Sequence, residues 1–155
     1  NGGPFPGRFV ATNVVETFSS DGPRRVFFNA SNAAITPGNF LASTSGGLLR
    51  QKTDITAADG APTSVPGFER FFGTSAAAPH AAAISGLVRE AFVKNGVASP
   101  TPTQIRNALT TTALDIEAAG VDRDAGAGIL QAVRVLAGGR SGTGDGAHLL
   151  GLVAQ

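Results

Sequence analysis

The alanine-rich segment 72–83 constrains the fold of this chain more than any other part of the sequence. It reads Phe72-Gly73-Thr74-Ser75-Ala76-Ala77-Ala78-Pro79-His80-Ala81-Ala82-Ala83. The apolar residues after it recur at helical spacing and fall on one face: Ile84, Leu87, Val88, Ala91 and Phe92. The pattern predicts one long helix that begins near Thr74 or Ser75 and ends at Asn95-Gly96, where glycine can adopt the left-handed capping conformation.

Ser75 falls in the first turn of this predicted helix. The backbone N–H groups there have no partner within the helix, and the positive end of the helix dipole favours a developing anion. A nucleophilic serine at this position has its own N–H available as an oxyanion donor. Pro79 comes early enough that its missing N–H costs less than it would in the middle of the helix. A plain helix cap is the alternative reading of Gly73-Thr74-Ser75 taken alone.

The segments before this helix are predicted to be short strands joined by turns. β-branched and aromatic residues indicate the strands, and clusters of Gly, Pro, Asn and Asp indicate the connections. The predicted strands are 9–18, 25–28, 33–36 and 53–57, and the predicted turns and irregular connections are 19–23, 29–32, 37–52 and 61–72.

Two further helices are predicted after residue 100. Thr101 is an N-cap residue, Pro102 suits the first helical position, and Gln104 completes a capping box. The expected buried stripe of this helix is Ile105, Ala108, Leu109 and Thr112. The last helix is predicted over about 128–137, and its aligned apolar residues are Ile129, Val133 and Leu136.

Composition narrows the possible partners. The net charge is +1 and the arginines are scattered, whereas nucleic-acid binding needs a clustered basic face. There are no cysteines, and no apolar run approaches the roughly 18 residues that span a bilayer. We therefore expect neither a nucleic acid nor a membrane as a partner. Residues 138–146 have the composition of a Gly-rich linker, and 147–155 form a short apolar tail.

The pattern Gly73-Thr74-Ser75-x-Ala77-x-Pro79-His80 resembles the serine-box signature of the subtilase family, in which the serine is the nucleophile. Other segments resemble that family in the expected order over about residues 15–137. They are Phe18-Ser19-Ser20-Asp21-Gly22, Thr53-Asp54-Ile55-Thr56-Ala57, Thr101-Pro102-Thr103-Gln104-Ile105, Leu109-Thr110-Thr111-Thr112-Ala113 and Gly126-Ala127-Gly128-Ile129-Leu130.

The resemblance implies an α/β fold. Residues 1–137 would be the C-terminal part of a three-layer subtilisin-like domain, with a parallel sheet flanked by helices and an inserted hairpin or loop at about 23–50. It implies a serine endopeptidase that cleaves polypeptides through an acyl-enzyme on Ser75, with an extracellular or cell-envelope location. Gly73, Thr74, Pro79 and His80 would be supporting residues of the motif.

Some positions depart from the family pattern. Ala83 stands where glycine is frequent, and Ala57-Ala58-Asp59 stands where Ala-Pro-Gly is usual. The stretch before Ile55 is also longer than in compact members. None of these departures is expected to touch the nucleophile.

A serine protease of this kind also needs a base and an acid that orients it. His80 lies about 140° round the helix from Ser75, so we expect it to bond to backbone instead of acting as the base. His148 lies beyond the linker. Asn13 is set aside as an oxyanion donor, because a core or edge position in the strand predicted over 9–18 suits it better.

The family order along the chain is Asp, His, Ser. It places the acid, the base and the oxyanion Asn upstream of residue 1, so we expect this chain, which lacks methionine, to be part of a longer protein and inactive without the missing N-terminal part. The alternative is a non-catalytic fragment or pseudo-protease that acts as a binding or assembly module and self-associates through apolar faces.

No cofactor is expected from the residues, although the resemblance leaves calcium possible in the parent family. Asp115, Asp122 and Asp124 could gather around a cation, but a solvated loop is the simpler interpretation. The Gly-rich stretch 142–146 is interpreted as linker and not as a phosphate or calcium loop.

Overall fold

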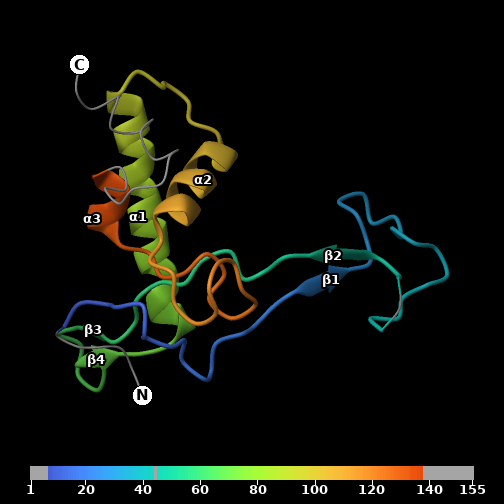
Figure 1. Cartoon of the computed structure of the whole chain (residues 1–155), viewed down its shortest axis with the longest axis horizontal. Helices are drawn as coiled ribbons and strands as arrows, with labels where there is room; N and C mark the ends of the chain where they lie inside the picture. Colours follow the sequence, from blue (N-terminus) through green and yellow to red (C-terminus); the bar gives the residue numbers. More distant parts are fainter. Residues whose placement is uncertain (1–6, 44, 138–155) are drawn as a thin grey trace.

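The computed structural model describes residues 7–43 and 45–137, which form three helices and two small sheets. Figure 1 shows the helices packed together, with one sheet in an arm that projects away from them. The elements are β1 (Arg24–Val26), β2 (Leu48–Arg50), β3 (Ala61–Pro62), β4 (Arg70–Phe71), α1 (Thr74–Lys94), α2 (Pro102–Thr112) and α3 (Ala132–Leu136). No helix among the described residues is both long and apolar enough to cross a bilayer.

The long helix predicted from segment 72–83 is confirmed as α1. It begins at Thr74 and ends at Lys94, with Asn95 as the C-cap residue. Gly96 follows at φ +88°, in the left-handed region that the Asn-Gly pair predicts. Val88 and Phe92 of the predicted apolar face are buried, so α1 packs against the core through this face.

The predicted start of α2 is also confirmed. The hydroxyl of Thr101 accepts a hydrogen bond from the N–H of Gln104 at 3.2 Å, and the side chain of Gln104 accepts one from the N–H of Thr101 at 2.8 Å. Pro102 occupies the first helical position. Ala108 and Leu109 are buried against the core, as the predicted stripe requires. Local signals therefore suffice to define this helix.

The capping box allows a direct test of how much the start of α2 stabilises the fold. Thr101→Ala removes the hydroxyl that satisfies the N–H of Gln104, and we expect it to lower the free energy of unfolding by about 1 kcal/mol in urea denaturation. Thr103→Ala is the matched control, because Thr103 lies in the same turn and its hydroxyl makes none of the capping bonds. A loss as large for the control would show that the capping bonds are not the cause.

The prediction for the last helix is wrong at its start. α3 spans only Ala132–Leu136, because Gly128 lies at φ +109° and the next residues are extended. Ile129 pairs with Thr56 in a parallel bridge and with Leu114 in an antiparallel one. The expected helical stripe therefore does not form: Ile129 is buried through these bridges, and the side chain of Val133 is 80% exposed.

The core divides into two clusters. The first joins all three helices and comprises Val88, Phe92, Ala108, Leu109, Leu130 and Val135. The second lies under the loops that follow α2 and comprises Ile116, Ala125 and Ile129. Phe9 and Val15 pack against the second cluster, so the N-terminal segment is held in part by the loop region.

The strand predicted over 9–18 is absent. A strand needs a ladder partner, and backbone N–H groups of this stretch bond to loop groups instead. The N–H of Val15 donates to a Glu117 carboxylate oxygen at 2.6 Å, and that of Asn13 donates to the carbonyl of Val10 at 3.0 Å. Just after the stretch, the N–H of Gly22 donates to the carbonyl of Arg123 at 2.8 Å.

The arm is an antiparallel ribbon of β1 and β2. Arg24 lies opposite Arg50 and Val26 lies opposite Leu48. The predicted pairing of 25–28 with 33–36 is reduced to a bridge between Phe28 and Ala34, so 33–36 is not a strand. The prediction of 37–52 as loop missed β2. The arm lies within the stretch in which the resemblance suggests an insertion.

The mixture of helices and strands is consistent with an α/β protein, but both sheets are small and antiparallel. Among the described residues, parallel pairing is limited to the bridge between Thr56 and Ile129, so 53–57 does not form a full strand. The stretch 61–72, predicted as irregular, contains the β3–β4 hairpin. A flanked parallel sheet is therefore not what the described residues form.

Candidate active site

The turn that precedes α1 is built on Gly73. This residue has φ +118° and ψ 164°, a backbone conformation that is essentially restricted to glycine. Its carbonyl accepts hydrogen bonds from the N–H groups of Ala76 at 2.9 Å and Ala77 at 3.1 Å. The helix therefore begins abruptly at Thr74, and Ser75 is its second residue.

Ser75 is exposed, and neither its hydroxyl nor its N–H has a hydrogen-bond partner among the described residues. The N–H is one of the free donors of a helix start. Pro79 stands four residues later and lacks an N–H, so the carbonyl of Ser75 also lacks its usual helical donor. The serine is thus accessible at the positive end of the helix dipole.

His80 is bound to its own helix. Its Nδ1 lies 2.9 Å from the carbonyl oxygen of Ala76, and the side chain is half-buried. The backbone contact expected for this histidine is present. The partner of Nδ1 is therefore the carbonyl of Ala76, the residue next to Ser75, and not the serine hydroxyl.

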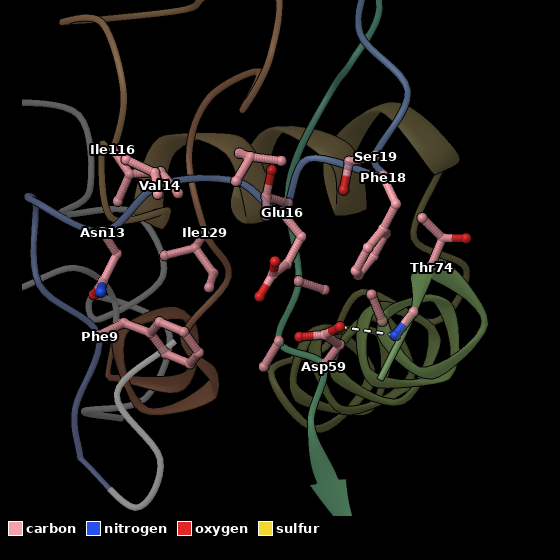
Figure 2. A pocket seen from close by; sticks show the side chains of 16 residues that line it. Phe9, Asn13, Val14, Glu16, Phe18, Ser19, Asp59, Thr74, Ile116 and Ile129 are labelled. Atoms are coloured by element: carbon pink, nitrogen blue, oxygen red, sulfur yellow. Dashed lines mark hydrogen bonds between the residues drawn. The ribbon is translucent and has the colours of Figure 1, made fainter. Parts of the chain in front are cut away.

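Asp59 is a residue near the Gly73 turn that the sequence analysis missed. Its Oδ2 accepts a hydrogen bond from the N–H of Gly73 at 2.8 Å, drawn as the dashed line in Figure 2. Asp59 is one of the departures from the family pattern, and it contacts Gly73, two residues before Ser75. A glycine at the N-cap position has no side chain that can cap the helix. Gly73 was therefore the signal in the sequence to look for a capping side chain in another segment.

A small cavity of about 50 Å³ lies beside the turn. Its lining comes from residues 9–19, from 56–59, from 73–77 and from Ile116 and Ile129. Figure 2 shows Glu16 and Asp59 extending toward the same part of this cavity, with Thr74 farther to the right, beyond Phe18. Ser75 is not among the residues that line this cavity.

Asn13 lies in a local turn and not in a strand. Its Oδ1 accepts a hydrogen bond from the N–H of Val10 at 2.7 Å, and its own N–H donates to the carbonyl of Val10 at 3.0 Å. Figure 2 shows Asn13 and Thr74 at opposite sides of the view. Asn13 was set aside as an oxyanion donor because a strand was predicted over 9–18. That reason was wrong, since Asn13 stabilises a turn.

The β3–β4 hairpin leads directly into the site, because Phe72 and Gly73 follow β4. Its tip is fixed by a hydrogen bond from the N–H of Gly67 to a Glu69 carboxylate oxygen at 3.1 Å. Hydrogen bonds from the backbone N–H of Glu69 itself and from that of Gly67 lower the pKa of this carboxyl. The ring of Phe68 packs edge-on against Phe71, with centroids 5.6 Å apart.

Two of the three aspartates considered for a cation, Asp115 and Asp122, accept hydrogen bonds within their own turns. Asp115 accepts from the N–H of Gly120 at 2.8 Å, and Asp122 accepts from those of Asp124 at 2.8 Å and Ala125 at 2.7 Å. Among the described residues, no group of three or more histidine, aspartate or glutamate side chains could hold a metal ion. His148 and residues 142–146 lie outside the described part of the chain.

Comparison with known proteins matches residues 10–128 to the model of the subtilase family. No curated protein and no solved structure matches the chain. The matched residues make up most of the chain and include the Gly73–Ser75 turn, α1 and α2. The chain therefore belongs to the subtilase family of serine proteases.

Proposed function

We propose that this chain supplies the nucleophile of a serine endopeptidase, and that Ser75 is that nucleophile. The single observation that carries the proposal is the placement of Ser75: exposed, second in α1, directly after the Gly73 turn, with its N–H unbonded within the described residues. Its Oγ would attack the scissile carbonyl carbon of a polypeptide. Its N–H would donate to the oxyanion that forms.

The reaction needs a base to take the Ser75 proton and return it to the leaving amine when the C–N bond breaks. Water would then hydrolyse the serine ester. His80 lies about 140° round α1 from Ser75 and its Nδ1 bonds to the carbonyl of Ala76 on the same helix, so we do not assign it as this base. We therefore assign the base, its orienting acid and the oxyanion Asn to residues outside this chain. The chain alone is inactive under this proposal.

The finer architecture follows from the same proposal. We place residues 1–137 in the C-terminal part of a three-layer domain, in which the parallel bridge between Thr56 and Ile129 would extend into a larger sheet. A missing N-terminal part would supply the neighbouring strands. Polypeptide is the substrate, and the family resemblance favours an extracellular or cell-envelope location.

A serine-directed phosphonate probe tests the proposal. It forms a bond to an activated serine hydroxyl, so we expect no labelling of the chain alone and labelling of Ser75 when the chain is produced together with its upstream part. Mass spectrometry of the tryptic peptides locates the label, and Ser75→Ala in the longer protein is the control. Labelling of the isolated chain would contradict the assignment of the base to residues outside it.

The alternative function is a non-catalytic binding or assembly module. The observation that favours it is the apolar surface of the arm, where Phe28, Phe40, Leu41, Leu48 and Leu49 are all about half exposed or more. Such surface on a monomer is typical of an interaction site. The labelling experiment separates the two functions, because a module would leave Ser75 unlabelled with or without the upstream part.

A further inference from the structure

We propose that Asp59 is a positioning residue that fixes the turn presenting Ser75. The inference rests on the proposed role of Ser75 as the nucleophile. The hydrogen bond between Gly73 and Asp59 lies within this chain and can be tested without catalysis. Asp59 lies at the end of the segment 56–59, and Gly73 is two residues before the serine. Their hydrogen bond therefore joins two parts of the chain that are separated by the whole β3–β4 hairpin.

Gly73 is held on both sides. Its N–H donates to Asp59 Oδ2 at 2.8 Å, and its carbonyl accepts from the first amides of α1, the N–H groups of Ala76 and Ala77. A glycine at φ +118° has many alternative conformations when unrestrained. The bond from Asp59 removes this freedom at the residue that sets the direction in which α1 begins.

The residue after Asp59 makes a second contact with the same turn. Gly60 is buried at φ +65°, and a Cβ atom there would lie 2.9 Å from the ring of Phe72. Only a glycine lets the ring approach so closely. The pair Asp59-Gly60 thus contacts the pair Phe72-Gly73 through one hydrogen bond and one close packing contact, which together form a clamp.

Asp59 also supplies what α1 lacks. The N-cap residue Gly73 has no side chain, and the first turn of the helix contains no acidic residue. A carboxylate at a helix start stabilises it through the dipole and through charge-assisted hydrogen bonding. Because Asp59 bonds to the N–H of Gly73, it leaves the N–H of Ser75 free to serve the reaction.

Amide hydrogen exchange measured by NMR on this chain tests the clamp without any catalysis. In Asp59→Ala, we expect the N–H of Gly73 to exchange about 10- to 100-fold faster relative to the core amide of Val88, as fits the loss of a hydrogen bond to a charged group. Asp59→Asn keeps an acceptor oxygen and should retain most of the protection. Glu16→Ala removes another carboxylate from the same cavity and should leave the Gly73 rate unchanged.

Unchanged Gly73 exchange in Asp59→Ala would overturn the proposal. In the longer, active protein, Asp59→Ala should lower kcat by up to about 10²-fold with little change in KM, and Asp59→Asn should restore most of kcat. An unaffected kcat in a protein that is itself active would also overturn the positioning role. If the wild-type protein shows no activity, the proposed function fails, and the exchange experiment still decides whether Asp59 fixes the turn.

Discussion

Ser75→Ala is expected to lower kcat of the assembled peptidase, meaning this chain together with its upstream part, by about 10⁶, the loss seen when subtilisin loses its serine. The reason is chemical, because alanine has no hydroxyl to attack the carbonyl and no covalent intermediate can form. The backbone N–H of residue 75 remains, so substrate binding and part of the oxyanion stabilisation should survive. Steady-state hydrolysis of a peptide substrate measures kcat and KM separately.

The matched control is Ser85→Ala on the same helix. Ser85 is half-buried and its hydroxyl donates to the carbonyl of Ala81 at 2.7 Å. Ser85→Ala therefore measures the effect of removing a serine hydroxyl from α1 at a position away from the start of the helix. We expect its kcat to remain near the wild-type value. Activity of Ser75→Ala within tenfold of the wild type would show that another residue is the nucleophile.

The bounds of α1 and the start of α2 could be predicted from the sequence because their signals are local. The capping box of Thr101 and Gln104 spans four residues, and Asn95-Gly96 ends α1 through the conformation of one glycine. Such signals act within a single turn and do not depend on the rest of the fold. The serine motif was recognised for the same reason, since Gly73, Thr74 and Ser75 are continuous in the sequence, and the role of Ser75 as the nucleophile stays a prediction.

The strands could not be predicted in this way, because pairing depends on residues far apart in the sequence. The stretch 9–18 has strand composition, yet the N–H of Val15 finds the side chain of Glu117 as its partner. Ile129 looks like the first apolar residue of a helix, but it is taken into bridges by Thr56 and Leu114. Tertiary partners decided both cases against the local pattern.

The candidate site also contains one part that local sequence signals predict and another that depends on residues far apart in the sequence. Gly73, Thr74 and Ser75 are adjacent, and their arrangement at the start of α1 follows from the motif. Asp59 lies fourteen residues before Gly73 and reaches it only because the intervening hairpin folds back. Its contact with Gly73 is therefore visible in the structure and not in the sequence.

Gly128→Ala is expected to destabilise the fold strongly. A Cβ atom at this position would lie 2.1 Å from the carbonyl oxygen of Leu114 and 3.0 Å from the Cα of Asp115, and both of these are backbone atoms. The carbonyl of Gly128 also accepts the hydrogen bond from the N–H of Thr56 at 2.9 Å, so any shift to relieve the clash weakens the parallel bridge. We expect a loss of about 4 kcal/mol or more, a large part of the stability of an ordinary domain.

Gly120→Ala isolates the contribution of the clash. Gly120 has φ +87°, which carries a similar backbone penalty of about 1–2 kcal/mol for alanine, but a Cβ atom there meets nothing within 4 Å. Urea denaturation followed by far-UV circular dichroism gives the free energy of unfolding of both variants, and an unchanged slope shows that the comparison is valid. Because only Gly128 faces backbone atoms, its variant should be less stable than Gly120→Ala by at least about 2 kcal/mol. Equal losses would mean that the close approach of residues 114 and 128 is not required by the fold.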